Sequence, residues 1–245
     1  MIVAIDGPAG AGKSSVAKEV GKKLGLTYID TGAMYRALTY KALENNIDIS
    51  DGNKLEKLLN ESEIELVPNF EKNILNIILD KNDITDKIRT PEISQAVSEI
   101  ATHKKVREIM VYKQRYIAEI RKKVIMDGRD IGTVVFPEAD VKIFLTASVI
   151  ERAKRRAMEL ESTGINVDMD SLIKDIKNRD KKDSEREVAP LRPADDAIIV
   201  DTTELNYEEV ILKIADIIEK VSKIKEKENN MFFSNKSNDL LMNLI

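Results

Sequence analysis

A glycine-rich stretch near the start of the chain holds the residues with the clearest chemical potential. It reads Gly7-Pro8-Ala9-Gly10-Ala11-Gly12-Lys13-Ser14-Ser15 and fits the pattern G-x-x-x-x-G-K-[ST] in full. Glycines let successive backbone N–H groups turn inward around phosphate oxygens, and a following helix start adds partial positive charge. Lys13 would then reach the β- and γ-phosphates, and Ser14 would hold Mg²⁺. The motif predicts binding of ATP or GTP.

Side chains that follow the next two predicted strands indicate a second anion site. Arg36 comes after the second strand and Arg129 directly after the third. Thr31 lies in the turn after the second strand and offers a hydroxyl or backbone contact. Asp127, at the end of the third strand, could serve Mg²⁺ through water. Ligands of a doubly wound sheet bind outside the carboxyl ends of its strands, where these residues are expected; ordinary turn residues are the alternative interpretation.

A densely charged segment late in the chain supplies further arginines. In the run from Asn178 to Arg186, the side chains of Arg179, Asp183 and Arg186 share one helical face at spacings of three and four. A solvated, salt-bridged helix explains the same pattern. Phosphoryl transfer between two phosphorylated molecules needs several cations around one point, a task to which the guanidinium fork is suited.

Two other classes of nucleotide-binding protein fit less well. A GTPase would need an Asn-Lys-x-Asp guanine reader, which neither 53–56 nor 235–238 matches. A motor ATPase would need an apolar strand that ends in Asp-Glu, whereas Asp127 is followed by Gly128-Arg129-Asp130. Both classes are disfavoured.

Composition narrows the chemistry further. The 245 residues include no Cys and a single His, His103, which excludes disulfides, thiolate zinc sites, cysteine nucleophiles and hydrolases that need two imidazoles. The net charge of −4 gives no overall attraction to nucleic acid. With no signal-like or membrane-spanning stretch, a cytoplasmic protein is expected.

Apolar periodicity predicts an α/β fold. Short buried strands at 2–5, 27–29, 124–126, 141–145 and 197–200 alternate with helices at 14–24, 35–45 and 207–225, which is typical of a five-stranded parallel sheet flanked by helices. Residues 63–89 interrupt this rhythm and indicate short antiparallel strands joined by Asn-rich turns, forming a small inserted β-rich subdomain. One long helix is expected from Pro91 to about Lys123, and a polar, flexible tail over 222–245.

Several motifs in a fixed order resemble those of bacterial cytidylate (CMP) kinases, members of the nucleoside-monophosphate kinases. The resemblance covers about residues 1–221. The motifs are Ile5-Asp-Gly-Pro-Ala-Gly-Ala-Gly-Lys-Ser14, Asp30-Thr-Gly-Ala-Met-Tyr-Arg36, Ile88-Arg-Thr90, Val106-Arg-Glu108, Asp127-Gly-Arg-Asp-Ile-Gly-Thr-Val-Val-Phe-Pro137, Lys142-Ile-Phe-Leu145 and Arg186-Glu-Val-Ala-Pro-Leu191. It implies a P-loop NTPase-type core, an inserted NMP-binding subdomain at about 63–90 and a mobile helical lid at about 168–190.

The reaction that the resemblance implies is transfer of the γ-phosphoryl of ATP to CMP or dCMP with Mg²⁺, giving CDP or dCDP and ADP. The residues that would hold the CMP phosphate are Thr31, Arg36 and Arg129. The residues that would read the cytosine are Ser98, Arg107 and Asp130. Arg179 and Asp183 would meet the sugar and phosphate. Arg186 would stabilise the transferring group, alongside Lys13, Arg129 and Arg179 as the catalytic set.

The resemblance also places Arg155, on the helix after the fourth strand, against the adenine. Two positions depart from many relatives, which carry Ser in place of Thr31 and Arg in place of Lys182. Thr31 keeps the hydroxyl, but Lys182 lacks the bidentate fork, which puts its grip on ATP phosphates in doubt. No general base is required, because the CMP phosphate is already an anion.

Other interpretations stay open on the sequence. A uridylate or adenylate kinase could use the same frame, although Asp130 accepting from the cytosine amine and Arg107 donating argue for cytosine. A non-catalytic nucleotide-responsive protein would not need the second arginine cluster. The expected partners are the small-molecule substrates, with no nucleic acid and no membrane, and the chain is expected to be a monomer.

Overall fold

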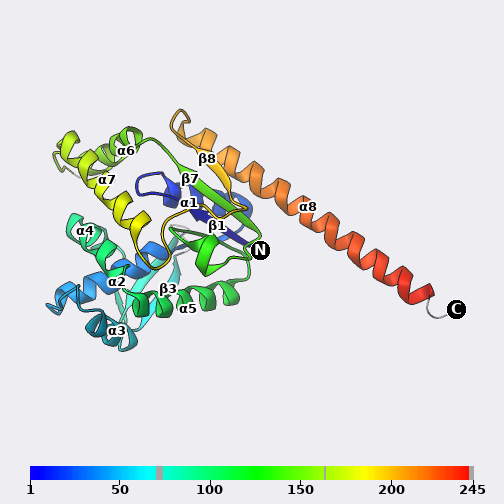
Figure 1. The fold of residues 1–245 in the computed structure, drawn as a ribbon, viewed down its shortest axis with the longest axis horizontal. Helices are drawn as coiled ribbons and strands as arrows, with labels where there is room; N and C mark the ends of the chain where they lie inside the picture. Colours follow the sequence, from blue (N-terminus) through cyan, green and yellow to red (C-terminus); the bar gives the residue numbers. More distant parts are fainter. Residues whose placement is uncertain (70–73, 163, 243–245) are drawn as a thin grey trace.

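The centre of the molecule is a parallel β-sheet with helices packed around it (Figure 1). A computed structural model describes residues 1–69, 74–162 and 164–242. Within that part of the chain the sheet has five strands in the order β2-β6-β1-β7-β8. The strands are β1 (Ile2–Asp6), β2 (Thr27–Asp30), β6 (Val124–Gly128), β7 (Val141–Thr146) and β8 (Ile198–Asp201). The α/β class and the five predicted strands are confirmed.

Strand register brings the predicted site residues to one edge of the sheet. β1 lies between β6 and β7, so that Asp6 pairs with Gly128 on one side and with Phe144 on the other. On the next strand out, Asp30 at the end of β2 pairs with Asp127. Because all strands are parallel, the loops that follow β1, β2 and β6 leave the sheet side by side.

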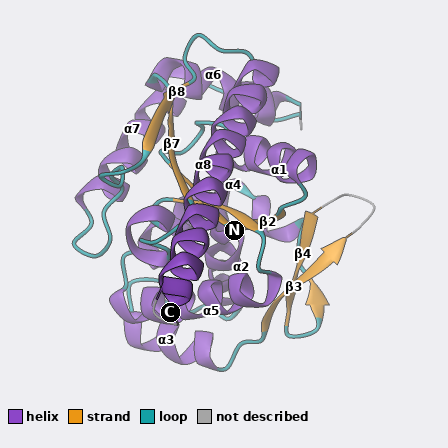
Figure 2. Ribbon diagram, turned by 90° about the vertical axis from the view of Figure 1, so that its right-hand side faces the viewer, coloured by secondary structure: helices purple, strands orange, loops and turns teal. Residues whose placement is uncertain are grey.

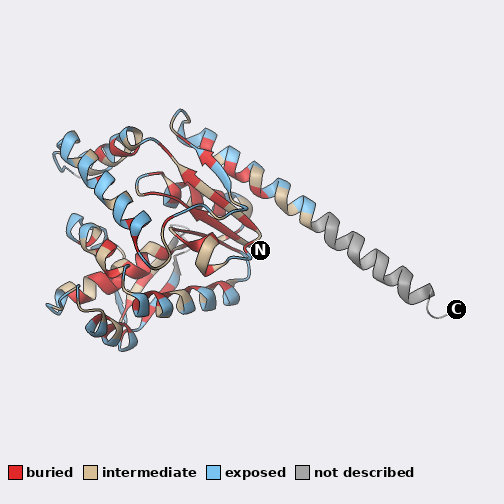
Figure 3. Ribbon diagram, in the orientation of Figure 1, coloured by how far each residue is buried: buried red, intermediate tan, exposed pale blue. Residues whose placement is uncertain are grey.

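Two hydrophobic cores cover the two faces of the sheet. Side chains alternate along a strand, so Val3 and Ile5 face one side, where α1 (Lys13–Leu24) and α8 (Tyr207–Met242) pack. Ala4 faces the other side, where α2 (Thr31–Glu44), α3 (Gly52–Asn60) and α5 (Lys104–Arg121) pack. Figure 3 shows this burial concentrated in the sheet and the helices that flank it.

The predicted insert forms a small antiparallel sheet, at the opposite end of the molecule from β7 and β8 in Figure 2. Its strands are β3 (Ile64–Asn69), β4 (Ile74–Leu79) and β5 (Asn82–Asp83). The short antiparallel strands expected within 63–89 are confirmed, but the third, β5, has only two residues, and the chain after it turns into a short 3₁₀ helix, η1 (Lys87–Arg89). The turn expected between the first two strands, at 70–73, lies outside the described residues.

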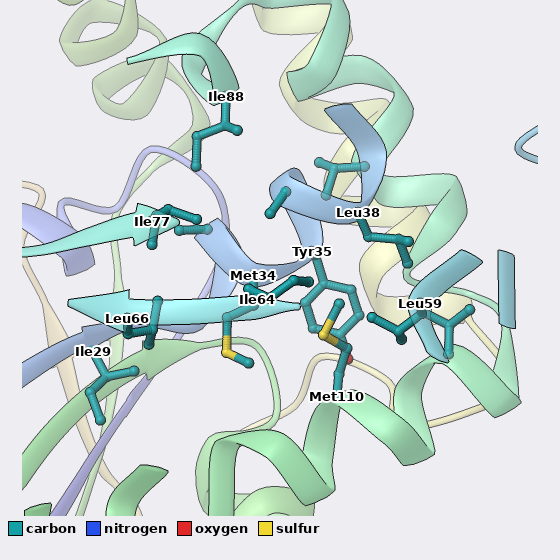
Figure 4. Close-up of a cluster of buried hydrophobic side chains, with 14 of the residues drawn as sticks. Ile29, Met34, Tyr35, Leu38, Leu59, Ile64, Leu66, Ile77, Ile88 and Met110 are labelled. Atoms are coloured by element: carbon teal, nitrogen blue, oxygen red, sulfur yellow. The ribbon is translucent and has the colours of Figure 1, made fainter. Parts of the chain in front are cut away.

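The inner face of this small sheet belongs to the larger core. Ile64, Leu66 and Ile77 pack with Met34 of α2 and Met110 of α5, as Figure 4 shows. The alternation of buried and exposed residues along β3 leaves Val67 exposed. The insert is thus fixed to α2 and the central sheet by shared apolar contacts.

The single long helix predicted over 91–123 is two helices, α4 (Pro91–Ile100) and α5. Thr102 Oγ1 donates to the Glu99 carbonyl at 2.7 Å, and His103 takes an extended backbone conformation as the residue before α5. His103 Nε2 hydrogen-bonds the Ile49 carbonyl at 2.8 Å. Side-chain capping and a tertiary hydrogen bond therefore break a helix that carries no Gly or Pro at this point.

Other helix boundaries also differ from the expected ones. α2 begins at Thr31 rather than at 35, because the Asp30 carboxylate accepts from the Ala33 N–H and caps the helix. α3 was not expected; its signal is the Asp51 cap followed by leucines at 55, 58 and 59. α8 runs to Met242 rather than to 225, so the segment expected as a polar tail continues this helix, and 243–245 lie outside the described residues.

The segment expected as a lid forms a helical pair with the helix before it. α6 (Val149–Glu161) packs against α7 (Met169–Glu185), which also touches α4 (Figure 1). α7 is largely exposed, and its buried residues are Ile176 and Asp183 (Figure 3). Among the described residues, none of the helices combines the length and apolar character needed to cross a membrane.

Candidate active site

The glycine-rich loop connects β1 directly to α1, as the motif predicts. Gly7, Gly10 and Gly12 have φ angles of 149°, 76° and 86°, which side chains rarely adopt. A Cβ at Gly7 would lie 1.9 Å from the Leu145 carbonyl oxygen, so the loop passes β7 at a distance that only glycine allows. Lys13 is 5% exposed, and its ammonium donates to the Pro8 carbonyl at 2.8 Å. The loop has the backbone conformation of a phosphate cradle.

Two side chains whose oxygens could bind a metal ion meet beside the glycine-rich loop: Ser14 at the start of α1 and Asp127 near the end of β6. Ser14 Oγ donates to Asp127 Oδ2 at 2.7 Å, and Tyr28 Oη donates to Asp127 Oδ1 at 2.8 Å. Thr31 Oγ1 donates to the Asp127 carbonyl at 2.6 Å, which ties the start of α2 to the end of β6. Burial and the neighbouring Asp30 raise the pKa of Asp127. A hydroxyl and one carboxylate beside a phosphate cradle fit Mg²⁺, which keeps several waters and takes few protein ligands.

Four cations from separate elements converge beside the loop. Burial and the positive charges of Arg129 and Arg179 lower the pKa of Lys13 to about 7. Burial, Arg129 and Arg36 lower the pKa of Arg179 to about 10. Within the described residues, the buried Nε atoms of Arg36 and Arg179 have no hydrogen-bond partner. Burial also acts to lower the pKa of Arg129, but the carboxylate of Asp183 outweighs it and raises this pKa. The positive charge is therefore least compensated at Lys13 and Arg179.

Two carboxylates partly balance this cluster. Arg36 donates to Asp30 Oδ2 at 2.6 Å, and Arg129 Nε donates to Asp183 Oδ2 at 2.8 Å. Asp183 comes from α7, so the lid segment reaches the turn after β6. The structure places Arg36 and Arg129 close enough to Arg179 to lower its pKa in addition to the effect of burial.

The residues predicted to read the base form a second buried group. Asp130 accepts from Arg107 of α5 and lies 3.5 Å from the guanidinium of Arg186. Arg107 also stacks over the Tyr35 ring, 5.8 Å from its centre. Ser98 is buried on α4, but within the described part of the chain no hydrogen bond joins it to Arg107 or Asp130.

A cavity of about 380 Å³ opens next to this group, between the ends of α4 and α7. It is lined by Glu99, Thr102, Lys182, Glu185 and Arg186. Lys182 thus lies at this cavity. Arg186 belongs both to the cavity and to the group around Asp130.

Arg155 lies beside the P-loop on α6. Its Nη1 would be 3.9 Å from a Cβ at Gly12, and its guanidinium donates to Thr202 Oγ1 at 3.0 Å and to the Thr202 carbonyl at 2.7 Å. Arg155 thus lies next to the loop, and its contact with adenine stays a prediction.

Sequence reasoning missed two buried residues that support the site. Asp6 accepts from the Ile131 and Gly132 N–H groups at 2.8 and 2.7 Å and so fixes the turn that carries Arg129 and Asp130. Arg152 of α6 contacts both the P-loop and α7. The only signal for Asp6 was its place at the end of a buried strand, and Arg152 was one of several charged residues on an amphipathic helix.

The fold and the site together define a class of protein. A P-loop at the end of a central parallel strand, with a second arginine cluster facing it, is the arrangement of a P-loop kinase. The cytidylate kinase family model matches residues 3–220 of the chain. The chain belongs to the cytidylate kinase family, which confirms the predicted resemblance.

Curated relatives agree over nearly their whole length. Cytidylate kinase of Alkaliphilus oremlandii (strain OhILAs) is 54% identical over 89% of this chain and 98% of the relative. Cytidylate kinase of Bacillus subtilis (strain 168) is 52% identical over 90% of this chain and 97% of the relative. Among solved structures, a gluconokinase from Sinorhizobium meliloti 1021 is 14% identical and covers 95% of each chain, with a TM-score of 0.45.

Proposed function

We propose that this chain transfers the γ-phosphoryl of ATP to CMP or dCMP by positioning and charge neutralisation, without a general base. The observation that carries the proposal is the convergence of Lys13, Arg36, Arg129 and Arg179 beside the glycine-rich loop, where burial and neighbouring cations lower the pKa of Lys13 and of Arg179. Such a cluster is relieved when phosphates enter it. Because two phosphorylated substrates meet in this reaction, it needs more cations than a P-loop alone supplies.

The P-loop and its neighbours would bind ATP. The backbone of 7–15 would cradle the phosphates, and Lys13 would exchange its bond to the Pro8 carbonyl for the β- and γ-phosphates. Ser14 and Asp127 would hold Mg²⁺, which when bound neutralises charge on the phosphates. Arg155 would lie against the adenine. This assignment is supported by the loop conformation and by the position of Arg155 beside Gly12.

The monophosphate would bind on the other side of the cluster. Thr31, Arg36 and Arg129 would hold its phosphate, the attacking group, which is already an anion. Asp130 would accept from the cytosine amine, and Arg107 would donate to a ring acceptor. Uracil presents a carbonyl where cytosine has the amine and would face Asp130 unfavourably. Ser98 would complete this reader from α4.

The lid segment would close the site. Arg179 and Asp183 would meet the sugar and phosphate, and Arg186 would stabilise the transferring group. Closure of 168–190 over the phosphates would expel water and limit hydrolysis of ATP. Every residue in this assignment comes from one chain, so the proposed reaction needs no second copy, and the protein is proposed to act as a monomer.

The test is release of ADP by the purified protein with Mg-ATP and, separately, CMP, dCMP, UMP, AMP and GMP. Lys13→Ala provides the blank. Turnover highest with CMP and dCMP would support the proposal. Highest turnover with UMP or AMP would show that the residues assigned to cytosine recognise another base. If no monophosphate gave turnover above the blank while ATP still bound, the kinase proposal would fall in favour of a nucleotide-responsive binding protein.

A further inference from the structure

The side chain of Arg152 joins three separate segments around the P-loop. It is almost fully buried on α6, and its Nε donates to the Ala147 carbonyl at 3.0 Å, in the loop after β7. Its Nη1 donates to the Ala9 carbonyl, within the P-loop, at 3.0 Å. The same guanidinium donates to both carboxylate oxygens of Asp180 on α7, at 3.0 and 2.6 Å. One residue therefore links the P-loop to the lid helix.

The packing around Arg152 leaves little room for another arrangement. A Cβ at Gly10 would lie 3.1 Å from the Arg152 Cβ, so the P-loop backbone rests directly against this residue. Planar, bidentate pairing with a carboxylate fixes orientation as well as distance. Asp180 is the residue that this geometry holds on α7, with a side chain 23% exposed.

Arg179 directly precedes Asp180 in the sequence, and neighbouring charges oppose its position in the site. Arg179 lies among cations, and Arg129 and Arg36 repel it. Its Nε is buried and has no hydrogen-bond partner in the part of the chain that the structure describes. Another ion pair that joins α7 to the rest of the site, between Asp183 and Arg129, uses a guanidinium that would turn to the substrate phosphate. The Arg152 pair has no such competing duty, because its other partners are backbone carbonyls.

We propose that Arg152 and Asp180 are positioning residues that hold the lid helix on the P-loop and thereby keep Arg179 at the reacting phosphates. This inference rests on the proposed function, in which Arg179 contacts phosphate. The proposed function assigns no substrate contact to Arg152 or to Asp180. Their effect on turnover passes through Arg179, which makes it distinguishable from a general loss of stability.

The test is a double-mutant cycle between Asp180→Asn and Arg179→Ala, read as kcat and KM for ATP. Asp180→Asn keeps the shape of the side chain and removes its charge, and we expect kcat to fall about tenfold. In the Arg179→Ala background the same substitution should have no further effect, because the residue that it positions is gone. Asp180→Glu, which retains a carboxylate, should restore most of the turnover. Asp175→Asn, at an exposed position of α7, is the matched control.

The outcomes separate the two proposals. If D180N behaves like D175N, or if its effect multiplies with that of R179A, the positioning role is overturned. Multiplication is what an independent loss of folded protein would give, and thermal melts of each variant check for it. Should D180N fail to fold, Arg152→Lys replaces it in the cycle, since lysine keeps the charge but not the fork. Failure of the wild-type protein to turn over CMP would count against the proposed function instead.

Discussion

At the scale of single residues, the site is an excess of buried positive charge held in place by a few carboxylates. Burial, and after it the neighbouring cations, lower the pKa values of Lys13 and Arg179. Asp183 balances Arg129, and Asp130 balances Arg107. A folded chain keeps several buried cations close together only where its other contacts hold them in place. Such fixed charges are expected of a preorganised electrostatic site.

Removal of Arg129 tests whether the ATP phosphates and the CMP phosphate are bound by separate sets of residues. We expect Arg129→Ala to lower kcat by about a hundredfold or more, as loss of one charge-stabilising donor commonly does. ATP affinity should change little, because the P-loop, Lys13 and Arg155 remain. Steady-state kinetics with CMP and calorimetric titration with an ATP analogue provide the two readings. Loss of both properties together, or of neither, would contradict the role assigned to Arg129.

Asp130→Asn tests how the base is selected. An amide can turn its N–H₂ toward the carbonyl of uracil, so discrimination between CMP and UMP should narrow by about tenfold or more in kcat/KM. The quantity compared is the ratio of kcat/KM for CMP to kcat/KM for UMP. A ratio is needed because the substitution also changes the ion pairs with Arg107 and Arg186, which affects turnover of both substrates. Asp195→Asn, a fully exposed carboxylate, is the control. An unchanged ratio alongside reduced turnover would assign Asp130 to support of Arg107 rather than to the base.

At the scale of elements, the end of β1 is tied to the turn after β6 through Asp6. Its carboxylate accepts from two backbone N–H groups of that turn, yet burial raises its pKa to about 6. The folded pKa thus lies above the ordinary value of 3.8, so the unfolded chain ionises first as pH rises. The contribution of Asp6 to stability is therefore greatest at low pH and falls until pH exceeds the folded pKa.

Asp6→Asn should remove this pH dependence. From the two pKa values, the unfolding free energy of the wild type relative to the variant should fall by about 2 kcal/mol between pH 4.5 and 7.5. Urea unfolding of both proteins across this range measures the difference, and other titrating groups cancel in the comparison. Parallel stability curves would show that Asp6 titrates with an ordinary pKa.

Elements were predictable where local pattern and tertiary structure agree. The five central strands and the P-loop follow from buried apolar runs and one motif, and the arginines after strands follow from strand direction. The break before α5 depends on His103 reaching Ile49, a contact between segments far apart in the sequence. The roles of Arg152 and Asp180 were not predicted because they also depend on a contact between distant segments. In the sequence, both look like any other charged residue on a helix.

The insert offers a test of how elements share a core. Ile77 of β4 is 3% exposed and packs in the cluster formed by α2 and α5. Ile77→Ala should lower the unfolding free energy of the whole protein by about 2 to 4 kcal/mol, because it leaves a cavity in the common core. Urea unfolding followed by circular dichroism measures this, and Val67→Ala on the exposed face is the control. Faster hydrogen exchange confined to 64–83 with an unchanged unfolding midpoint would show that the insert unfolds independently.

At the scale of the whole molecule, α8 closes the core on the face opposite the insert. Val210, Ile214 and Ile218 are buried against the side of the sheet covered by α1. Farther along, Ser222 donates to the sulfur of Met1 at 3.8 Å, and Lys225 donates to Asp140 at 3.1 Å. The family model ends at residue 220, close to the last of these contacts. Folding and catalysis are therefore expected to depend on α8 only as far as this point.

Truncation after Lys225 tests that limit. The shortened chain keeps the buried residues of α8 and the ion pair to Asp140, so its Tm should lie within about 2 °C of the full chain and its kcat/KM for CMP within about twofold. Truncation after Ile217 is the matched comparison, because it also removes Ile218, which is 1% exposed, and should lower stability by about 2 to 5 kcal/mol. A large loss of turnover in the chain ending at 225, with an unchanged Tm, would give residues 226–245 a role in the reaction. Equal stability of both truncated chains would instead show that residues 218–225 of α8 do not contribute to the stability of the core.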